Sequence, residues 1–367
     1  MSTIVLMAGG TGGHLFPAMA LAQELRRRGH DIQLMTDHRV ASYGDGFPAS
    51  ATHVVPSATP SVRNPIKFVT AGMRLSGGIA VAWGMLRRIR PAVVVGFGGY
   101  PVFPPFVAAS VLGIPGILHE QNAVMGRANR ALARMAKLIA LSFEPTAKTE
   151  DFAEKCVLVG NPVRDRVREV SDTAYPPLDP ATGTINLLVF GGSQGARVFG
   201  ELVPSAVSDI PATLRARLRI TQQCRPEDLD RVAEVYRKAK VNVELASFFD
   251  DLPKRMAEAH LVISRSGAST VAELAALGRP AILVPLPGAL DADQKNNALV
   301  LQRAGGGWIA DQATLTPQSL GTRLTSLFGD PEGLAAAAAA ARSQGQPDAV
   351  SKLADHVERL AQKEISA

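Results

Sequence analysis

The sequence contains only two cysteines, Cys156 and Cys224, which lie far apart and form no Cys-x-x-Cys pair. A disulfide framework and a zinc site therefore lack support, and a reducing compartment fits this cysteine usage. Aromatic residues are also scarce, at 5% of the chain, and no stacking platform or nucleic-acid-binding motif is found. The net charge of +6 favours an acidic partner, and we expect a phosphorylated substrate or an anionic membrane surface, with no nucleic acid.

Charge is absent from Pro91 to Leu118, a length sufficient to span a bilayer. Prolines and glycines recur through this stretch and would break a spanning helix. We expect two buried strands joined by a loop and a short helix instead. The apolar stretch at the N-terminus ends at Gly9 and has no basic leader, which predicts a buried first strand rather than a signal peptide.

Short runs of Val, Ile and Leu without polar alternation are typical of parallel strands that are covered on both faces. They occur at residues 4–6, 32–34, 93–95, 116–118 and 138–141, and again at 185–190, 218–220, 243–245, 261–263 and 281–284. At 367 residues the chain exceeds what one hydrophobic core usually organises. The sequence therefore predicts an α/β protein with two Rossmann-like, doubly wound parallel-sheet domains.

The predicted domains are residues 1–162, completed by a C-terminal helix at about 345–367, and residues 163–344. The first helix is expected to begin at Pro17 and to end before Gly29. The segment Gly160-Asn161-Pro162 is the predicted hinge, because glycine, asparagine and proline are typical of turns.

Two glycine-rich loops follow predicted strands and precede helices, at Gly9–His14 (GGTGGH) and Gly191–Arg197 (GGSQGAR). Backbone N–H groups at such a turn favour a diphosphate. The first loop is not the dinucleotide fingerprint, because Leu15 stands where the third glycine would be. A plain tight turn is the alternative for either loop alone, and the pair favours a site in a cleft between two facing domains.

Three further segments combine polar residues with a predicted strand end or helix start. Residues 119–122 (HEQN) follow a buried strand, so they either face a ligand or make loop hydrogen bonds. In residues 265–273 (RSGASTVAE), Thr270 and Glu273 have the spacing of a capping box, and Glu273 alternatively binds two ribose hydroxyls. Residues 291–297 (DADQKNN) suit sugar hydroxyls or a polar helix cap.

Taken together and in this order, these segments resemble the N-acetylglucosaminyltransferases of peptidoglycan synthesis, which add GlcNAc from UDP-GlcNAc to lipid I to give lipid II. The resemblance covers nearly the whole chain, from Gly9 to about Gly307, and includes residues 160–164 (GNPVR). It implies the GT-B fold, with the UDP-GlcNAc donor in the cleft and the first domain serving the acceptor and the membrane.

The resemblance also implies roles for individual residues. Contacts with the sugar or its surroundings are implied for Thr11, Gly12, Gly13, Asn122 and Gln294. Contacts with the diphosphate and nucleoside are implied for Arg164, Ser193, Phe249, Ala268, Ser269, Thr270, Val271, Ala272 and Glu273. The chain departs from the family at Phe249, where an aliphatic residue is expected, and at Asp293, where a second glutamine is often found.

The implied reaction inverts the anomeric carbon in one displacement by the 4-hydroxyl of the muramyl sugar. The first candidate for the base is His14, because imidazole titrates near neutral pH, and the second is Glu120. We expect helix dipoles and Arg164 to neutralise the leaving diphosphate, with no essential metal and no cofactor.

A lipid-linked muramyl-pentapeptide acceptor requires contact with a membrane, and residues 66–90 offer it. Their apolar residues alternate with five cations, a composition suited to an interfacial helix on anionic lipid. The apolar residues are Phe68, Met73, Leu75, Ile79, Trp83, Leu86 and Ile89, and the cations are Lys67, Arg74, Arg87, Arg88 and Arg90. An amphipathic helix packed on the sheet is the alternative.

The resemblance places the protein at the cytoplasmic face of the bacterial inner membrane as a peripheral protein, with other enzymes of cell-wall synthesis as partners. Two other functions fit the same sequence features. One is a UDP-GlcNAc 2-epimerase, an isomerase that needs no lipid acceptor. The other is a non-catalytic protein that binds a nucleotide sugar and never turns it over.

Overall fold

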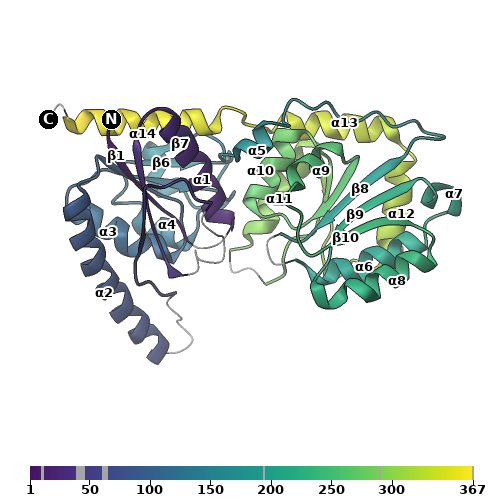
Figure 1. The fold of residues 1–367 in the computed structure, drawn as a ribbon, viewed down its shortest axis with the longest axis horizontal. Coiled ribbons are helices and arrows are strands. Elements are labelled where there is room, and N and C mark those ends of the chain that lie inside the picture. Colours follow the sequence, from purple (N-terminus) through teal and green to yellow (C-terminus); the bar gives the residue numbers. More distant parts are fainter. Residues whose placement is uncertain (10–11, 39–45, 60–64, 193–194, 289–290, 366–367) are drawn as a thin grey trace. The chain divides into compact units, whose positions relative to one another are not determined.

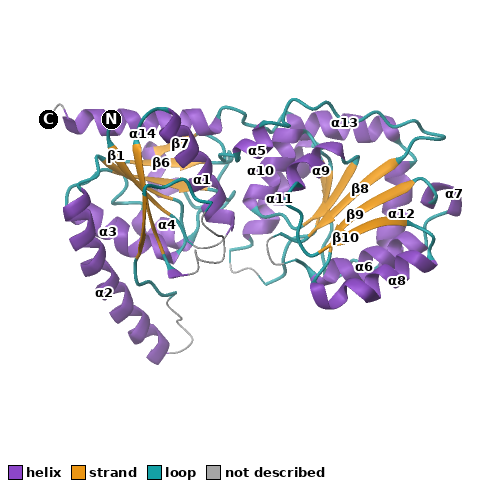
Figure 2. Ribbon diagram, in the orientation of Figure 1, coloured by secondary structure: helices purple, strands orange, loops and turns teal. Residues whose placement is uncertain are grey.

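The computed structural model describes residues 1–9, 12–38, 46–59, 65–192, 195–288 and 291–365, with only the backbone described for 65–68 and 363–365. The chain divides into two compact units. Unit 1 comprises Met1–Asp165 and Gln346–Ala367, and unit 2 comprises Arg166–Gly345. Each unit is built around one parallel sheet covered by helices on both faces (Figures 1 and 2).

Unit 1 has a seven-stranded sheet in the order β3-β2-β1-β4-β5-β6-β7. The strands are β1 Thr3–Met7, β2 Asp31–Thr36, β3 Ala51–Val54, β4 Val93–Gly96, β5 Gly116–Glu120, β6 Leu138–Leu141 and β7 Cys156–Leu158. The helices are α1 Gly12–Arg27, α2 Pro65–Ile89, α3 Phe103–Val111, α4 Arg127–Leu132 and α14 Ala349–Ile365, with short 3-10 helices η2 Tyr100–Val102 and η3 Glu150–Lys155.

Unit 2 has a six-stranded sheet in the order β10-β9-β8-β11-β12-β13. The strands are β8 Ile185–Phe190, β9 Leu218–Gln223, β10 Asn242–Ala246, β11 Leu261–Ser264, β12 Ala281–Leu283 and β13 Gly307–Ile309. The helices are α6 Arg197–Ser208, α7 Ala212–Arg215, α8 Leu229–Lys238, α9 Leu252–Glu258, α10 Ala268–Leu277, α11 Asp293–Ala304, α12 Pro317–Phe328 and α13 Pro331–Arg342, with the 3-10 helix η4 Pro226–Asp228. Helix α5, Asp165–Arg168, begins at the junction of the two units.

Strand β1 shows why the predicted strands are apolar without alternation. Ile4 and Leu6 belong to a buried cluster with residues of α1 and α14, whereas Val5 and Met7 belong to a second cluster with residues of α2 and α3. Because side chains of a strand point alternately to the two faces, a sheet covered on both faces needs apolar residues at every position. The prediction of two doubly wound parallel sheets is confirmed.

The sequence did not predict the edge strands β3, β7 and β13. Strand β3 (ATHV) has half-buried and exposed residues in alternation, and β7 and β13 are three residues long. An edge strand of this kind lacks the continuous apolar run by which the central strands are recognised.

The predicted start of the first helix at Pro17 is wrong, because α1 already begins at Gly12 and contains Pro17. The preference of proline for a first turn suggested the later start. As a result Gly13 and His14 lie in the first turn of α1, where backbone N–H groups have no acceptor within the helix.

Helix α14 packs on α1 through both its apolar and its charged residues. Leu353 and Val357 are fully buried in the cluster that also contains Leu21 and Leu25. Arg28 donates to Asp355 and Glu358 at 2.7 and 2.8 Å, and these ion pairs hold α14 against the C-terminal end of α1.

Helix α2 has a buried and an exposed face. Leu86 is fully buried, and Ile79 and Ile89 pack against the same cluster beneath the helix. The expectation that these three residues face a membrane is wrong, and for them the alternative of a packed amphipathic helix is confirmed. Met73 and Trp83 remain 63% and 37% exposed.

Unit 2 contains a buried arginine that joins several chain segments. Arg279, which is 1% exposed, donates hydrogen bonds to the carbonyls of Ala257 and Leu277, near the ends of α9 and α10. It also donates to Thr173 and Ala174 at 3.1 and 3.0 Å. Burial lowers the pKa of its guanidinium to about 10. The carbonyl ends of helices carry partial negative charge, which compensates the buried cation.

We predict that Arg279→Lys destabilises unit 2, because an ammonium group cannot reach the carbonyls that the planar guanidinium joins. The free energy of unfolding is expected to fall by about 3 kcal/mol, and thermal unfolding measures it. Arg323→Lys is the matched control, since Arg323 is exposed and donates one bond, to Ile309. Equal melting temperatures for the two variants would contradict this role of Arg279.

Candidate functional site

In unit 1 the polar segments follow three neighbouring strands. Strands β1, β4 and β5 are adjacent and parallel, so the loops that follow them lie at one edge of the sheet. These loops contain Gly9, the pair Gly98-Gly99 and the pair Gln121-Asn122, and His119 and Glu120 are the last two residues of β5. Thr11 lies outside the described residues. Open parallel sheets bind ligands at this edge.

The side chain of His14 lies at the centre of these loops. It is half-buried in the first turn of α1, and its Nδ1 is 3.1 Å from Oε1 of Gln121. Its ring lies against Gly98 and Gly99, which have φ values of +82° and +77°. A Cβ atom on Gly99 would be 3.3 Å from Nε2 of His14, so these glycines make room for the ring. The loops after β1, β4 and β5 therefore meet at one imidazole.

The carboxylate of Glu120 is engaged inside unit 1. Glu120 is 1% exposed, and its Oε1 accepts from the backbone N–H and the amide of Asn122 at 3.0 and 3.2 Å. Its Oε2 accepts from the N–H of Gly126 at 3.0 Å and from Asn129 at 2.7 Å. Hydrogen bonds of this kind stabilise a buried carboxylate and fix the loop that carries them.

The structure supports the interpretation in which the side chains of residues 119–122 make hydrogen bonds within the protein. His119, Glu120 and Gln121 are each at most 1% exposed, and only Asn122 is half-buried. The expectation that all four side chains face a ligand is therefore wrong for three of them. Burial lowers the pKa of His119 to about 4, so its imidazole is neutral at physiological pH.

Arg164 belongs to unit 1, three residues past the buried Asn161. Its guanidinium lies 4.1 Å from the ring centroid of Phe16, in a cation–π contact with helix α1. The side chain is half-buried. The contact places this cation beside the helix that begins with the glycine-rich loop.

In unit 2 the corresponding loops follow β8, β11 and β12, which are also adjacent and parallel. The N–H of Gly191 donates to Oε1 of Gln223 at 3.0 Å, and a Cβ atom on Gly191 would collide with the backbone of Ala196. The loop after β8 is thus a tight glycine turn into α6. Ser193 lies outside the described residues.

Helix α10 begins at Ala268, so the predicted capping box of Thr270 and Glu273 is wrong. The N-cap residue is Gly267, which has no side chain to cap with, and Thr270 is the third residue of the helix. Ala268, Ser269 and Thr270 form the first turn, Val271 is fully buried and Ala272 is half-buried. Glu273 is 7% exposed in the second turn.

Unpaired hydroxyls gather around the start of α10. The Oγ atoms of Ser264, Ser266 and Ser269 are buried and have no hydrogen-bond partner in the described part of the chain. A buried hydroxyl without a partner is unfavourable, so such a group indicates a missing ligand or water. Ser269 was predicted to contact the nucleotide and Ser266 lies in the same segment without a predicted role, whereas Ser264 was not predicted, because a serine within a strand has no distinctive pattern.

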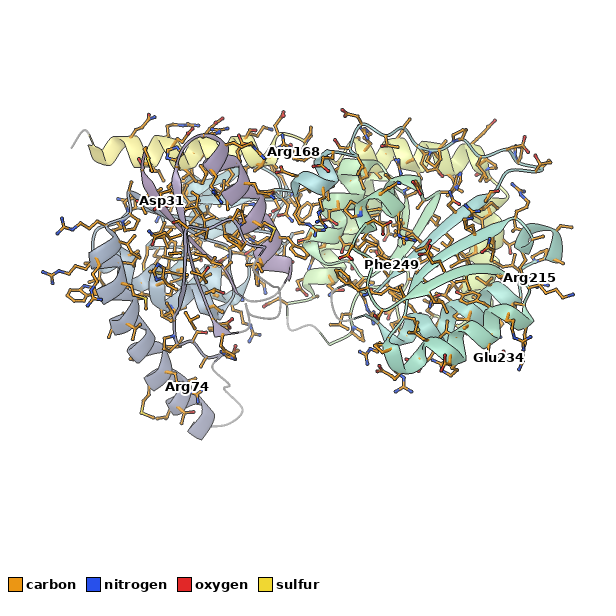
Figure 3. All side chains as sticks on the ribbon, in the orientation of Figure 1. Asp31, Arg74, Arg168, Arg215, Glu234 and Phe249 are labelled. Carbon is orange, nitrogen blue, oxygen red and sulfur yellow. The ribbon has the colours of Figure 1, made fainter. Side chains whose placement is uncertain are left out.

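Phe249, for which the resemblance implies a nucleoside contact, is largely buried. Phe249 (Figure 3) is 8% exposed. The guanidinium of Arg255 lies 4.4 Å from its ring centroid. Its neighbour Phe248 is 64% exposed and was not predicted. The ring of Phe248 is therefore more accessible than that of Phe249.

Gln294 is the second residue of α11, and its Oε1 accepts from the N–H of Leu286 at 3.0 Å. The N-cap of α11 is Ala292, with φ +50° and no side-chain cap, so the polar-cap interpretation of residues 291–297 is wrong. Gln294 instead ties the start of the helix to the loop after β12.

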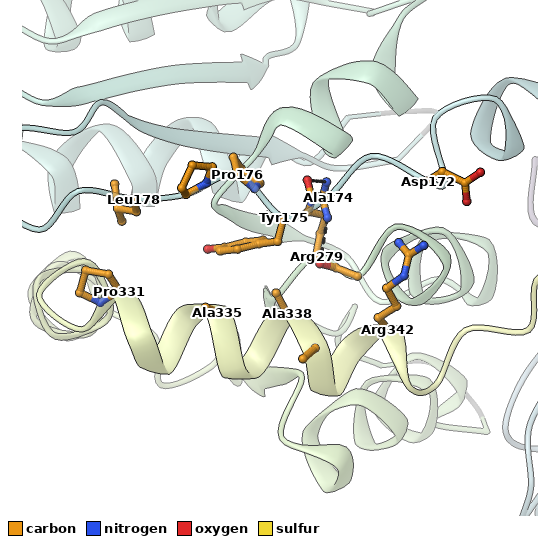
Figure 4. A pocket seen from close by; sticks show the side chains of 13 residues that line it. Asp172, Ala174, Tyr175, Pro176, Leu178, Arg279, Pro331, Ala335, Ala338 and Arg342 are labelled. Carbon is orange, nitrogen blue, oxygen red and sulfur yellow. Dashed lines mark hydrogen bonds between the residues drawn. The ribbon is translucent and has the colours of Figure 1, made fainter.

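A pocket of about 510 Å³ in unit 2 contains none of the predicted residues (Figure 4). Tyr175, Pro176, Arg279 and Ala338 are among the residues that line it. It lies beside the N-terminal end of β12, away from the loops described above.

Among the described residues, every helix is too short or too polar to span a membrane.

Two doubly wound parallel-sheet units are the architecture of the GT-B fold, which this chain shares with known glycosyltransferases. The family model of the glycosyltransferase family 28 N-terminal domain matches residues 4–141, and that of the C-terminal domain matches residues 186–358. The chain belongs to glycosyltransferase family 28.

Known relatives match over nearly their full length. A protein of Methylobacterium sp. (strain 4-46), "UDP-N-acetylglucosamine--N-acetylmuramyl-(pentapeptide) pyrophosphoryl-undecaprenol N-acetylglucosamine transferase", is 56% identical over 96% of this chain and 95% of its own length. The protein of the same description from Chelativorans sp. (strain BNC1) is 52% identical over 99% and 96%. The crystal structure of Acinetobacter baumannii MurG is similar with a TM-score of 0.78 and 30% identity, covering 98% of this chain and all of that one.

We predict that Gly99→Ala lowers the kcat of glycosyl transfer about tenfold, because the new Cβ displaces the ring of His14. Gly113→Ala is the matched control, since Gly113 has the same φ of +77° and nothing within 4 Å of the added Cβ. Both variants carry the backbone strain of roughly 1–2 kcal/mol, and only the first touches the imidazole. An equal kcat for the two variants would show that the contact with His14 is unimportant.

Proposed function

We propose that the protein transfers GlcNAc from UDP-GlcNAc to the 4-hydroxyl of the muramyl sugar of lipid I, giving lipid II and UDP in peptidoglycan synthesis. The observation that carries the proposal is the 56% identity with the Methylobacterium transferase over almost all of both chains. The matched family models cover both units, so the resemblance includes the two sets of loops described above.

Unit 2 holds the nucleotide in this proposal. The unpaired hydroxyls of Ser266 and Ser269 suit phosphate oxygens, and the backbone N–H groups at the start of α10 add donors with a favourable helix dipole. Glu273 in the second turn binds the ribose hydroxyls. Gln294 contacts the sugar through its amide, whose oxygen already fixes the loop at Leu286.

Unit 1 supplies the groups that take part in the chemical step of the transfer. His14 takes the proton of the muramyl hydroxyl while its oxygen attacks the anomeric carbon and the bond to the diphosphate breaks, so that UDP leaves with the electron pair. Glu120 serves as a structural anchor, since four donors already engage its carboxylate. Helix dipoles and Arg164 neutralise the leaving diphosphate, so the reaction needs no metal.

The exposed face of α2 contacts anionic lipid and brings the protein to the cytoplasmic face of the inner membrane. Val69, Met73 and Trp83 are 59%, 63% and 37% exposed and lie on one side of the helix. The guanidinium of Arg87 lies 5.1 Å from the ring centroid of Trp83. Arg74 is exposed on the same helix (Figure 3). Enzymes that make or use the lipid substrate are the expected partners there.

We predict that the protein releases UDP from UDP-GlcNAc only in the presence of a lipid I analogue, with the GlcNAc recovered on the analogue. Coupled UDP detection and mass spectrometry of the lipid measure the two products. A 2-epimerase would instead convert the sugar without an acceptor, and a regulatory protein would bind UDP-GlcNAc without any product. Either of these results would contradict the proposed transfer.

The cations in and directly after α2 are expected to bind anionic lipid. Changing Arg74, Arg87, Arg88 and Arg90 to glutamine is expected to lower partition onto anionic vesicles by about two orders of magnitude or more, since each cation near the surface contributes roughly 1 kcal/mol. Vesicle sedimentation at low and high salt measures the loss. The control changes four exposed cations of unit 2 to glutamine: Lys238, Lys240, Lys254 and Arg323. Equal binding by both variants would exclude α2 as the lipid contact.

A further inference from the structure

Two side chains, Gln121 and His119, connect His14 to the backbone of Gly160. His119 has its Nε2 at 3.0 Å from the carbonyl oxygen of Gly160 and its Nδ1 at 2.9 Å from Nε2 of Gln121. The Oε1 atom of Gln121 lies 3.1 Å from Nδ1 of His14. His119 and Gln121 are 0% and 1% exposed, so within the described residues these contacts account for their polar atoms.

The chemistry of these atoms fixes each proton. A carbonyl oxygen only accepts, so Nε2 of His119 carries a proton and donates it to Gly160. Burial keeps this imidazole neutral, with its pKa lowered to about 4, so its Nδ1 must accept. The amide nitrogen of Gln121 is the donor, and it also donates to the carbonyl of His119 at 3.0 Å.

The double donation fixes the orientation of the Gln121 amide. In the flipped orientation the amide oxygen would face the carbonyl oxygen and the unprotonated Nδ1 of His119, which both repel it. Oε1 of Gln121 is therefore directed to His14 and only accepts. His14 must then carry its proton on Nδ1, which leaves the lone pair on Nε2.

We propose that Gln121 and His119 are positioning residues that hold His14 in the Nδ1–H tautomer, with Nε2 as the atom that takes the hydroxyl proton. The inference rests on the proposed function for the role of His14 and goes beyond it by assigning the reactive nitrogen and the residues that select it. The free imidazole side chain has two tautomers, and the wrong one has no lone pair on the atom that faces the substrate.

The surroundings of Nε2 agree with this role. It lies beside Gly99, where the missing side chain leaves space, and no described residue hydrogen-bonds it. The ring is half-buried and therefore accessible to a substrate. The neutral groups Gly98, Gly99 and Gln121 face the ring, and the Glu120 carboxylate is directed to Asn122, Gly126 and Asn129 instead.

The chain of hydrogen bonds ends on a backbone carbonyl rather than on a carboxylate. A carboxylate beside the base would favour the imidazolium and raise the pKa of His14. The amide of Gln121 selects the tautomer and adds no charge. One nitrogen of His14 is thus held for proton transfer by a neutral partner.

The experiment compares Gln121→Met, which keeps the length and loses the hydrogen bonds, with Gln121→Glu, which keeps an acceptor toward His14 and replaces the donor toward His119 with an oxygen. For the Met variant kcat is expected to fall by about tenfold to a hundredfold, since general-base catalysis contributes about 10²–10⁴-fold. The KM for UDP-GlcNAc is expected to stay within about twofold, because unit 2 binds the nucleotide.

The Glu variant is expected to retain more of kcat than the Met variant and to shift the acid limb of its pH profile upward. The sign follows from the carboxylate, which raises the pKa of His14, so that the basic form is lost at a higher pH than in the native protein. A kcat for Gln121→Met equal to the native value, or equal acid limbs for Gln121→Glu and the native protein, would overturn the proposal.

Nitrogen NMR of the ¹⁵N-histidine-labelled native protein tests the tautomer without any turnover. The His14 signals, assigned by their loss in His14→Gln, are expected to show a protonated Nδ1 and an unprotonated Nε2. The opposite assignment would overturn the proposal even if His14 is the base. Conversely, full activity of His14→Gln would remove the proposed base and leave the tautomer result intact, so the two failures are distinguishable.

Discussion

Unit 1 depends on the buried polar groups at the end of β5, which must all find hydrogen-bond partners inside the protein. Glu120 satisfies this requirement by accepting four hydrogen bonds, which fix the loop that leads to α4. His119 satisfies it through Gly160 and Gln121, and Gln121 in turn through His14. These hydrogen bonds therefore join the first turn of α1, the loop after β5 and the backbone of Gly160.

The two units share an architecture and differ in what they place at the carboxyl ends of their strands. Unit 1 places an imidazole held by neutral groups there, with Gly98 and Gly99 making room for it. Unit 2 places hydroxyl groups and a helix start there, with Ser264, Ser266 and Ser269 unpaired. Hydroxyls and backbone amides suit phosphate oxygens, whereas an imidazole suits proton transfer. The proposed division between nucleotide binding and chemistry follows from these two sets of groups.

Much of the fold was predictable because buried parallel strands leave a clear pattern. Val93–Gly96 and Leu261–Ser264 are apolar at almost every position, and the sequence placed both strands. The edge strand Ala51–Val54 was missed, because one side of it is exposed and its residues alternate. Pro17 misled the prediction of the helix start, because the glycines before it already adopt the helical conformation.

The candidate site was predictable as a set of residues and less so in its geometry. His14 was singled out as the base and Gln121 was named within residues 119–122, but the contacts of His14 with Gln121 and with Gly98 and Gly99 were not predicted, because they join residues more than 80 positions apart. Spacing suggested a capping box at Thr270, whereas the backbone begins the helix after Gly267. Local patterns identify the presence of a helix well and its boundaries and cap less well.

The central claim is that unit 2 binds the nucleotide and that unit 1 performs the chemistry. Calorimetric titration of UDP into Glu273→Gln and His14→Ala, with turnover measured on the same preparations, tests it directly. The account predicts that Glu273→Gln weakens UDP binding at least tenfold, whereas His14→Ala binds UDP like the native protein and loses most of its turnover. Native UDP affinity in Glu273→Gln, or native turnover in His14→Ala, would contradict it.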